Sequence, residues 1–170
     1  AGMPDEVPTQ TSVEPGDLTG GAADEAELTR RLLTAKPVTL VRDAEWPATA
    51  AAARASKARR MADHAEELLE LHGPTVACVA NNVATALAIA AELGKRKRTV
   101  ELLVGRMRPH DIHRLRERRP GLLTMEGDPD VDIVVATQTV EVGIDADFSA
   151  MVTELAPGSA LAQRAGRVNR

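Results

Sequence analysis

The sequence lacks the features that mark secreted and membrane proteins. It contains one cysteine, Cys78, so no disulfide can form within the chain, and its N-terminus does not combine a basic start with an apolar stretch. Its longest apolar segments, such as residues 83–91, are far shorter than the roughly 20 residues that span a bilayer. These absences predict a reducing, cytoplasmic setting without a membrane anchor.

Aromatic side chains are almost absent, at 1% of the sequence, and there is no tyrosine. Proteins that bind single-stranded nucleic acid by stacking its bases need such side chains as platforms. The composition therefore argues against base stacking, but it leaves binding through phosphates open.

The formal net charge of −4 hides an uneven distribution. Residues 1–30 carry seven acidic residues against one basic residue in a stretch rich in proline, glycine and threonine, which is typical of a disordered acidic linker. Residues 94–119, called the basic block below, carry ten Lys or Arg against three acidic residues. The basic block is either a phosphate-facing surface or a solvated helix face with a basic turn.

Strand and helix patterns alternate along most of the chain. Residues 48–71 are dense in Ala, Arg, Glu and Leu without an internal Gly or Pro, which predicts one long helix that stops at 72–74. This alternation predicts an α/β domain, with a mostly parallel sheet flanked by helices on both faces. The expected strands are 75–80, 99–104, 122–124, 131–137 and 150–155, and the other helices are 25–33, 82–93, 109–118 and one from Ser159. Residues 38–41 are expected to form a first strand or an extended connector.

We divide the chain into three parts on this basis. Residues 1–30 are the acidic flexible linker, residues 31–73 are a connector with the long helix, and residues 74–170 are the α/β domain. In open parallel sheets, function lies in the loops that leave the carboxyl ends of the strands. We therefore expect the functional residues in the loops after 80, 104, 137 and 155.

The sequence has no Gly-x-x-x-x-Gly-Lys-Ser/Thr phosphate loop and no Asp-Glu box of the kind that binds Mg²⁺ in helicase motors. Nucleotide chemistry would therefore need parts from another domain. His110 and His113 are spaced like metal ligands, but no third ligand accompanies them, so we expect no metal site.

Two motifs stand in the last third of the chain. Residues 135–145 read Val-Ala-Thr-Gln-Thr-Val-Glu-Val-Gly-Ile-Asp, and residues 163–170 read Gln-Arg-Ala-Gly-Arg-Val-Asn-Arg. Arg167 and Arg170 are three residues apart, so their guanidinium groups can point the same way, and such planar forks suit a polyphosphate. Taken alone, this spacing also fits arginines that cap the end of a helix.

In this order and in this class of sheet, the motifs resemble the second RecA-like domain of superfamily 2 helicases. Residues 135–145 resemble motif V of that family, residues 163–170 resemble motif VI, and residues 75–93 resemble motif IV. More narrowly, Leu-Leu-Val-Gly-Arg-Met-Arg-Pro at 102–109 is similar to the helicase-nuclease of type I CRISPR systems, in its subtype U or G branch. The Asn-Asn-Val-Ala-Thr-Ala run at 81–86 and residues 136–141 share this resemblance, which covers residues 74–170.

The resemblance implies a RecA-like three-layer fold and a role for each motif. Arg167 and Arg170 would act as arginine fingers on the γ-phosphate of ATP, and Gln163 would help to position them. Gly143 and Asp145 would meet the ribose of the nucleotide. The implied contacts to the nucleic-acid backbone are Arg106, Thr137, Asn81 and Thr139.

The resemblance also implies a function for the whole enzyme. We expect a fragment of an ATP-dependent DNA helicase or translocase of CRISPR interference that ends at its last motif and is inactive as an ATPase alone. The full-length enzyme would use ATP and Mg²⁺, neither of which this chain would bind alone. Its partners would be single-stranded DNA, a first RecA-like domain, an HD nuclease domain and an RNA-guided surveillance complex. The alternatives are another superfamily 2 RNA or DNA helicase, and a non-catalytic α/β module whose basic block binds an acidic partner.

Overall fold

The structure is a computed structural model, and it describes residues 26, 29, 36–42, 50–105, 108–124, 127–140 and 146–168. The chain divides into two compact units, Ala1–Pro37 and Val38–Arg170, and the elements described below all belong to the second. Most of the expected helix at 25–33 lies outside the described residues. Residues 38–41 form neither helix nor strand, so the expected first strand is wrong and the alternative of a connector remains.

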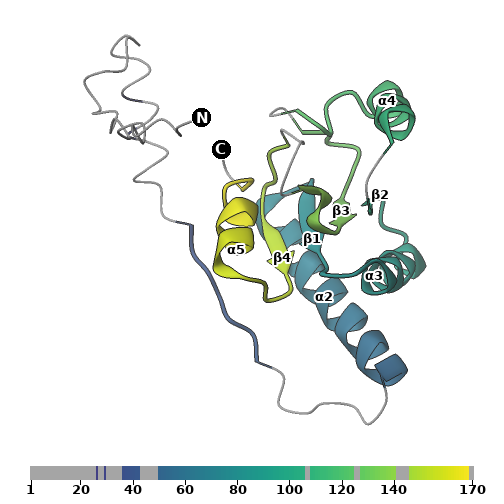
Figure 1. Ribbon diagram of the computed structural model, residues 1–170, viewed down its shortest axis with the longest axis vertical. Helices are drawn as coiled ribbons and strands as arrows, with labels where there is room; N and C mark the ends of the chain where they lie inside the picture. Colours follow the sequence, from purple (N-terminus) through teal and green to yellow (C-terminus); the bar gives the residue numbers. More distant parts are fainter. Residues whose placement is uncertain are drawn as a thin grey trace, which may run out of the picture. The chain divides into compact units, whose positions relative to one another are not determined.

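Four short strands form one parallel sheet (Figure 1). They are β1 (Val76–Val79), β2 (Val100–Leu103), β3 (Ile133–Ala136) and β4 (Met151–Thr153), and their order in the sheet is β2-β3-β1-β4. In the register, Val76 of β1 is opposite Ile133 of β3, and Ala77 of β1 is opposite Met151 of β4. The predicted α/β class with a parallel sheet is confirmed, and the carboxyl ends of all four strands lie at one edge.

The two faces of the sheet bury different residues because side chains alternate along each strand. Val76 and Cys78 of β1 belong to one apolar cluster, which includes residues of α2 (Ala50–His72) and α3 (Val83–Lys95). Ala77 and Val79 belong to the other cluster, which includes Leu115 of α4 (Pro109–Arg118). Both faces are therefore covered, as the buried apolar strands predicted.

The long helix α2 confirms the expected helix at 48–71 within the described residues. It ends at His72, and the next residue, Gly73, has a φ of +85° and donates its N–H to the carbonyl of Leu69 at 2.9 Å. Small side chains, including Ala58 and Ala62, let α2 pack closely in the first apolar cluster. We predicted that this helix belongs to the connector at 31–73. In the structure, its buried face is part of the core of the sheet domain.

The expected strand at 122–124 is wrong, because these residues form a turn. The N–H of Thr124 donates to the carbonyl of Gly121 at 3.1 Å, while Leu122 and Leu123 are buried. Gly121 lies so close to the chain at Gly127 that a Cβ atom built on it would be 2.0 Å from the carbonyl oxygen of that residue. The two leucines thus fill the core from a turn, and their apolar pattern reflects burial rather than strand pairing.

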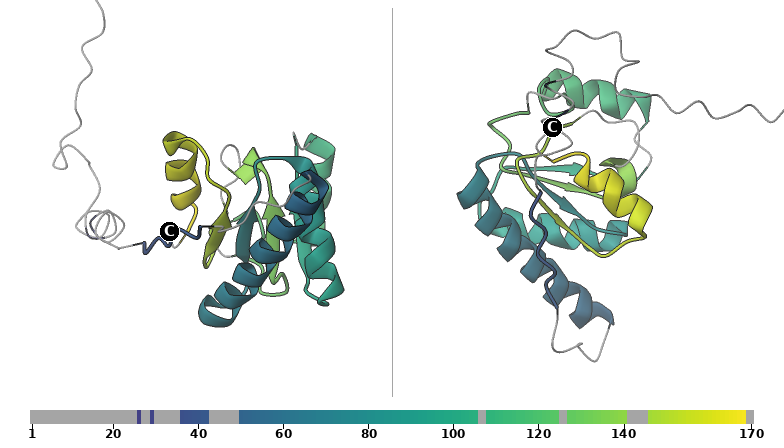
Figure 2. Two further views of the ribbon diagram at one scale, coloured as in Figure 1. Left: turned by 90° about the horizontal axis from the view of Figure 1, so that it is seen from below. Right: turned by 90° about the vertical axis from the view of Figure 1, so that its left-hand side faces the viewer.

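The final helix α5 (Gly158–Ala165) follows β4 and lies beside it in the views of Figures 1 and 2. A short 3-10 helix, η2 (Gln138–Val140), follows β3 after Thr137. Within the part of the chain that the structure describes, no helix is long and apolar enough to cross a membrane.

Candidate functional site

The loops that leave the four strands meet at the carboxyl edge of the sheet, because the strands are parallel. Asn81 follows β1, Gly105 follows β2, and η2 follows β3. Hydrogen bonds join neighbouring loops across this edge, as described below. Four of the predicted site residues, Arg106, Gly143, Asp145 and Arg170, lie outside the described residues.

Two hydroxyl groups after β3 hold the start of the loop after β2. The N–H of Gly105 donates to Oγ1 of Thr137 at 3.2 Å, and Oγ1 of Thr139 donates to the carbonyl of Gly105 at 2.7 Å. The N–H of Thr137 donates to the carbonyl of Leu103 at 3.1 Å, and its side chain is buried. Thr137 and Thr139 thus fix the point where the chain enters residues 106–107, and their direct contact with nucleic acid stays a prediction.

Asn81 uses all its polar groups within the domain, although it is exposed. Its N–H donates to a carboxylate oxygen of Glu154 at 2.5 Å, and its Nδ2 donates to the carbonyl of Leu155 at 2.7 Å. Its carbonyl accepts from Nε2 of Gln138 at 3.1 Å, and its Oδ1 accepts from Arg164 at 3.1 Å. Asn81 therefore links the ends of β1, β3 and β4 with α5. Its predicted contact with nucleic acid is not tested by this geometry.

The neighbouring Asn82 has a simpler role. Its side chain accepts from the N–H of Thr85 at 2.9 Å and caps α3.

Arg164 lies at the same edge of the sheet, although the sequence analysis did not name it as a candidate. Its side chain is buried, with 1% of the residue exposed. Its Nη1 donates to Oγ1 of Thr153 at 2.7 Å and to the carbonyl of Glu154 at 3.2 Å. The available signal was its position three residues after Leu161, which places Arg164 on the less exposed side of α5.

Glu154 was also missed, and it holds two elements together at the end of β4. Its carboxylate accepts from Lys57 of α2 at 2.5 Å as well as from the N–H of Asn81.

The thiol of Cys78 in β1 has a raised pKa. Burial is the larger cause and the charge of Glu154 is the smaller one, and together they raise this pKa to about 12. The thiol is therefore neutral at physiological pH and is not a nucleophile.

The described part of motif VI places Gln163 and Arg167 near the end of α5. Gln163 is exposed and Arg167 is half-buried. The backbone of Arg167 is fixed twice, since its N–H donates to the carbonyl of Arg164 and its carbonyl accepts from the N–H of Phe148, both at 2.9 Å. A guanidinium group on such a fixed backbone suits the recognition of a phosphate group.

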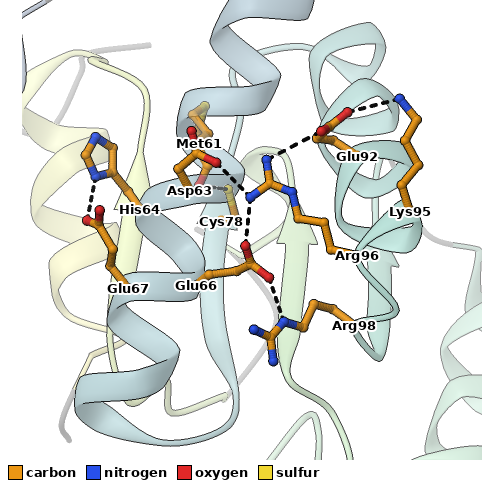
Figure 3. Close-up of polar contacts among 10 residues, drawn as sticks. All are labelled: Met61, Asp63, His64, Glu66, Glu67, Cys78, Glu92, Lys95, Arg96 and Arg98. Carbon is orange, nitrogen blue, oxygen red and sulfur yellow. Dashed lines mark hydrogen bonds and ion pairs between the residues drawn. The ribbon is translucent and has the colours of Figure 1, made fainter.

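The basic block divides into parts with different surroundings. Its first part lies at the amino end of β2, opposite the carboxyl edge, and its arginines are paired with carboxylates (Figure 3). Arg96 contacts Asp63 and Glu66, each at 2.7 Å, and Arg98 contacts Glu66 at 2.7 Å. In the second part, Arg118 and Arg119 are paired with Glu101 of β2. These pairs show that much of the block serves the fold.

The other arginines at the start of α4 and on it, Arg108, Arg114 and Arg116, are exposed. Arg108 pairs with Asp111 at 2.9 Å in the first turn, and Arg114 and Arg116 have no carboxylate partner among the described residues. The described residues also contain no group of three or more His, Cys, Asp or Glu that could hold a metal ion.

Comparisons with known proteins place these features in a family. Residues 72–170 match the family model described as the C-terminal part of the CRISPR-associated nuclease/helicase Cas3. Comparison with curated protein sequences gave no match.

Solved structures of Cas3 from T. fusca are also similar to this chain. One is 31% identical, with a TM-score of 0.55 over 65% of this chain and 13% of that one. A structure of T. fusca Cas3-ATP is 29% identical, with a TM-score of 0.54 over 65% of this chain and 14% of that one. The Cas3-AMPPNP structure has a TM-score of 0.59 over 84% of this chain and 17% of that one, and at 24% identity it supports the fold alone. The chain thus spans between 13% and 17% of the length of these proteins.

Proposed function

The chain belongs to the family of the C-terminal part of the CRISPR-associated nuclease/helicase Cas3, and from this premise we propose that it is the second RecA-like domain of an ATP-dependent DNA helicase. In the complete helicase, a first RecA-like domain supplies the phosphate loop and the Mg²⁺-binding carboxylates that this sequence lacks. This chain supplies the arginine fingers and part of the track for single-stranded DNA.

The observation that carries the proposal is the placement of motif VI. Arg167 lies just beyond the end of α5, on a backbone held by Arg164 and Phe148. A guanidinium group in a fixed position stabilises the charge that develops on the transferred phosphoryl group without reorganising at the moment of reaction. The proposed fingers are Arg167 and Arg170, and Gln163 positions them.

The residues of this chain fit a nucleotide only in part. Guanidinium groups suit the γ-phosphate, and Gly143 and Asp145 are the proposed contacts to the ribose. ATP with Mg²⁺ therefore binds between two domains, and this chain alone has too few contacts to hold it. The similarity to T. fusca Cas3-ATP supports a nucleotide in the complete enzyme.

The nucleic-acid track is proposed along the carboxyl edge of the sheet. Arg106, Thr137, Asn81 and Thr139 contact the DNA backbone directly or hold the loops that do. Contacts of this kind go to phosphates and carry no sequence preference. The low aromatic content agrees with this mode of binding.

The remaining partners follow from the family rather than from the geometry. We propose that the complete enzyme works in the cytoplasm, carries an HD nuclease domain, and is recruited by an RNA-guided surveillance complex. The alternative module that binds an acidic partner through the basic block is less well supported. Of the nine cations of the block that the structure describes, six are paired with carboxylates of this domain: Lys95, Arg96, Arg98, Arg108, Arg118 and Arg119.

The test of the proposal is ATP turnover by the complete helicase on single-stranded DNA. Replacement of Arg167 by alanine should abolish turnover while DNA affinity persists. A variant that turns over ATP normally would contradict the assignment of this domain as the source of the fingers.

A further inference from the structure

Arg164 is a charged side chain placed where an apolar one would satisfy packing. Only 1% of the residue is exposed, and the guanidinium donates to Thr153, to the carbonyl of Glu154 and to Asn81. Removing a cation from water is costly unless its hydrogen bonds are replaced. The guanidinium group of Arg164 donates to three residues at the strand ends. The side chain therefore serves to hold these residues in position rather than to bury apolar area.

The contact with Asn81 reaches the nucleic-acid edge proposed above. Asn81 is exposed, and Gln138, which donates to its carbonyl, is exposed as well. A DNA phosphate at this edge competes for the side-chain N–H groups of these two residues. Such competition reorients the same amide whose Oδ1 accepts from Arg164 at 3.1 Å.

The other end of Arg164 reaches the proposed finger. Its backbone carbonyl accepts the N–H of Arg167 at 2.9 Å, so a shift of Arg164 along α5 moves the backbone of Arg167. Asn81 and Arg164 are 83 residues apart in the sequence, and one hydrogen bond joins the loop after β1 to the finger segment.

We propose that Arg164 is a positioning residue that couples DNA binding at Asn81 to the placement of Arg167. This inference rests on the proposed function. A ligand shifts a protein between arrangements only by interacting differently with them. Here the difference is the orientation of the Asn81 amide, which sets where the guanidinium of Arg164 is held.

The experiment measures the stimulation ratio in the complete helicase, defined as kcat for ATP at saturating oligo(dT) divided by kcat without DNA. Saturation removes the effect of weaker DNA affinity. Asn81→Ala and Arg164→Lys should each lower the ratio by about 10-fold, because each breaks the shared contact. The double variant should be no worse than either single one, since both remove the same interaction.

Two further variants separate coupling from mere support of the fold. Thr153→Val removes another acceptor of Arg164 and leaves Asn81 in place, so it should lower the melting temperature and keep the stimulation ratio. Asn81→Asp keeps an acceptor for Arg164 but lacks the amide N–H that the phosphate takes, so it should lower the stimulation ratio as Asn81→Ala does. The Asn81 variants decide the matter even if Arg164→Lys does not fold.

The inference is overturned if the single effects multiply in the double variant, or if Asn81→Ala leaves the stimulation ratio unchanged. It is also overturned if Asn81→Asp, which lacks that N–H, keeps the stimulation ratio of the wild type. The proposed function fails separately, when Arg167→Ala leaves turnover intact. If Arg167→Ala has no turnover and Asn81→Ala has a normal stimulation ratio, the coupling is rejected and the proposed function is kept.

Discussion

The carboxylate of Glu66 in α2 accepts a hydrogen bond from Nε of Arg98 at 2.7 Å, across 32 residues of sequence (Figure 3). Its other oxygen accepts from Arg96 at 2.7 Å. Burial raises the pKa of Glu66, but the hydrogen bonds and charges of Arg98 and Arg96 outweigh burial and hold this pKa below its usual value. This pairing anchors the basic turn to α2 at the edge of the sheet opposite the site.

The first prediction concerns stability and pH. A group whose pKa is lowered on folding stabilises the fold above its ordinary pKa, here 4.5, and loses that contribution as the pH falls below this value. Glu66→Gln should therefore lower the free energy of unfolding by about 0.5 to 1 kcal/mol at neutral pH. The difference from the wild type should shrink as the pH is lowered below 4.5. Urea unfolding of the 170-residue chain at several pH values measures it.

Glu67→Gln is the matched control, one residue further along α2. Glu67 is mostly exposed and contacts His64 at 3.0 Å rather than the arginines. It should change stability less than Glu66→Gln at neutral pH. Equal losses for both variants would show that the pairs with Arg96 and Arg98 contribute nothing specific.

The second prediction concerns binding of single-stranded DNA. Affinity should be weak, independent of sequence and strongly dependent on salt, because the proposed contacts are to phosphates. Arg106→Ala should flatten the slope of log affinity against log salt by about 0.7, the value for one phosphate contact on a single strand. Fluorescence anisotropy with labelled oligonucleotides at several salt concentrations gives this slope.

Lys97→Ala is the charge-matched control for that measurement. Lys97 is exposed in the turn before β2, at the amino end of the sheet, so its loss should leave the slope unchanged. An unchanged slope for Arg106→Ala would remove Arg106 from the track. A flattened slope for Lys97→Ala would place DNA at the wrong edge of the sheet.

Much of the fold could be predicted because it depends on local patterns. The helix at 109–118 agrees with α4 residue for residue, since Pro109 fixes its start. The four strands were found from apolar runs, but each run was longer than the hydrogen-bonded strand, as with 131–137 against Ile133–Ala136. Burial extends beyond pairing, so apolar patterns overestimate strand length. The same effect made Leu122 and Leu123 look like a strand.

Candidate site residues could be predicted only where they belong to a sequence motif. Motif VI predicts roles for Gln163 and Arg167, and these roles stay predictions. The bond between Asn81 and Arg164 joins residues 83 apart and depends on how β1, β4 and α5 meet. Similarly, the sequence showed the cations of the basic block but not their partners on α2. Hydrogen bonds between distant residues follow from tertiary packing, which no local pattern encodes.

The third prediction concerns catalysis by the chain alone. The 170-residue chain should not hydrolyse ATP, with or without DNA, and should bind ATP poorly. The reason is that it has no phosphate loop and no Asp-Glu box to hold the phosphates and Mg²⁺. A phosphate-release assay on a rigorously purified sample measures this. DNA-stimulated turnover that co-purifies with the chain through several columns would overturn the prediction.

The last prediction separates a finger from a helix cap at Arg167. In the complete helicase, Arg167→Ala should lower ATP turnover by at least about 10³ while folding and DNA affinity stay nearly intact. Arg167→Lys should not restore turnover, because an ammonium group keeps the charge but loses the planar pair of donors. If Arg167 only caps α5, both variants should instead cost about 0.3 to 1 kcal/mol of stability and leave turnover unchanged. Steady-state ATPase and thermal melting of the same samples decide between these outcomes, and normal turnover with a lower melting temperature would reject the finger.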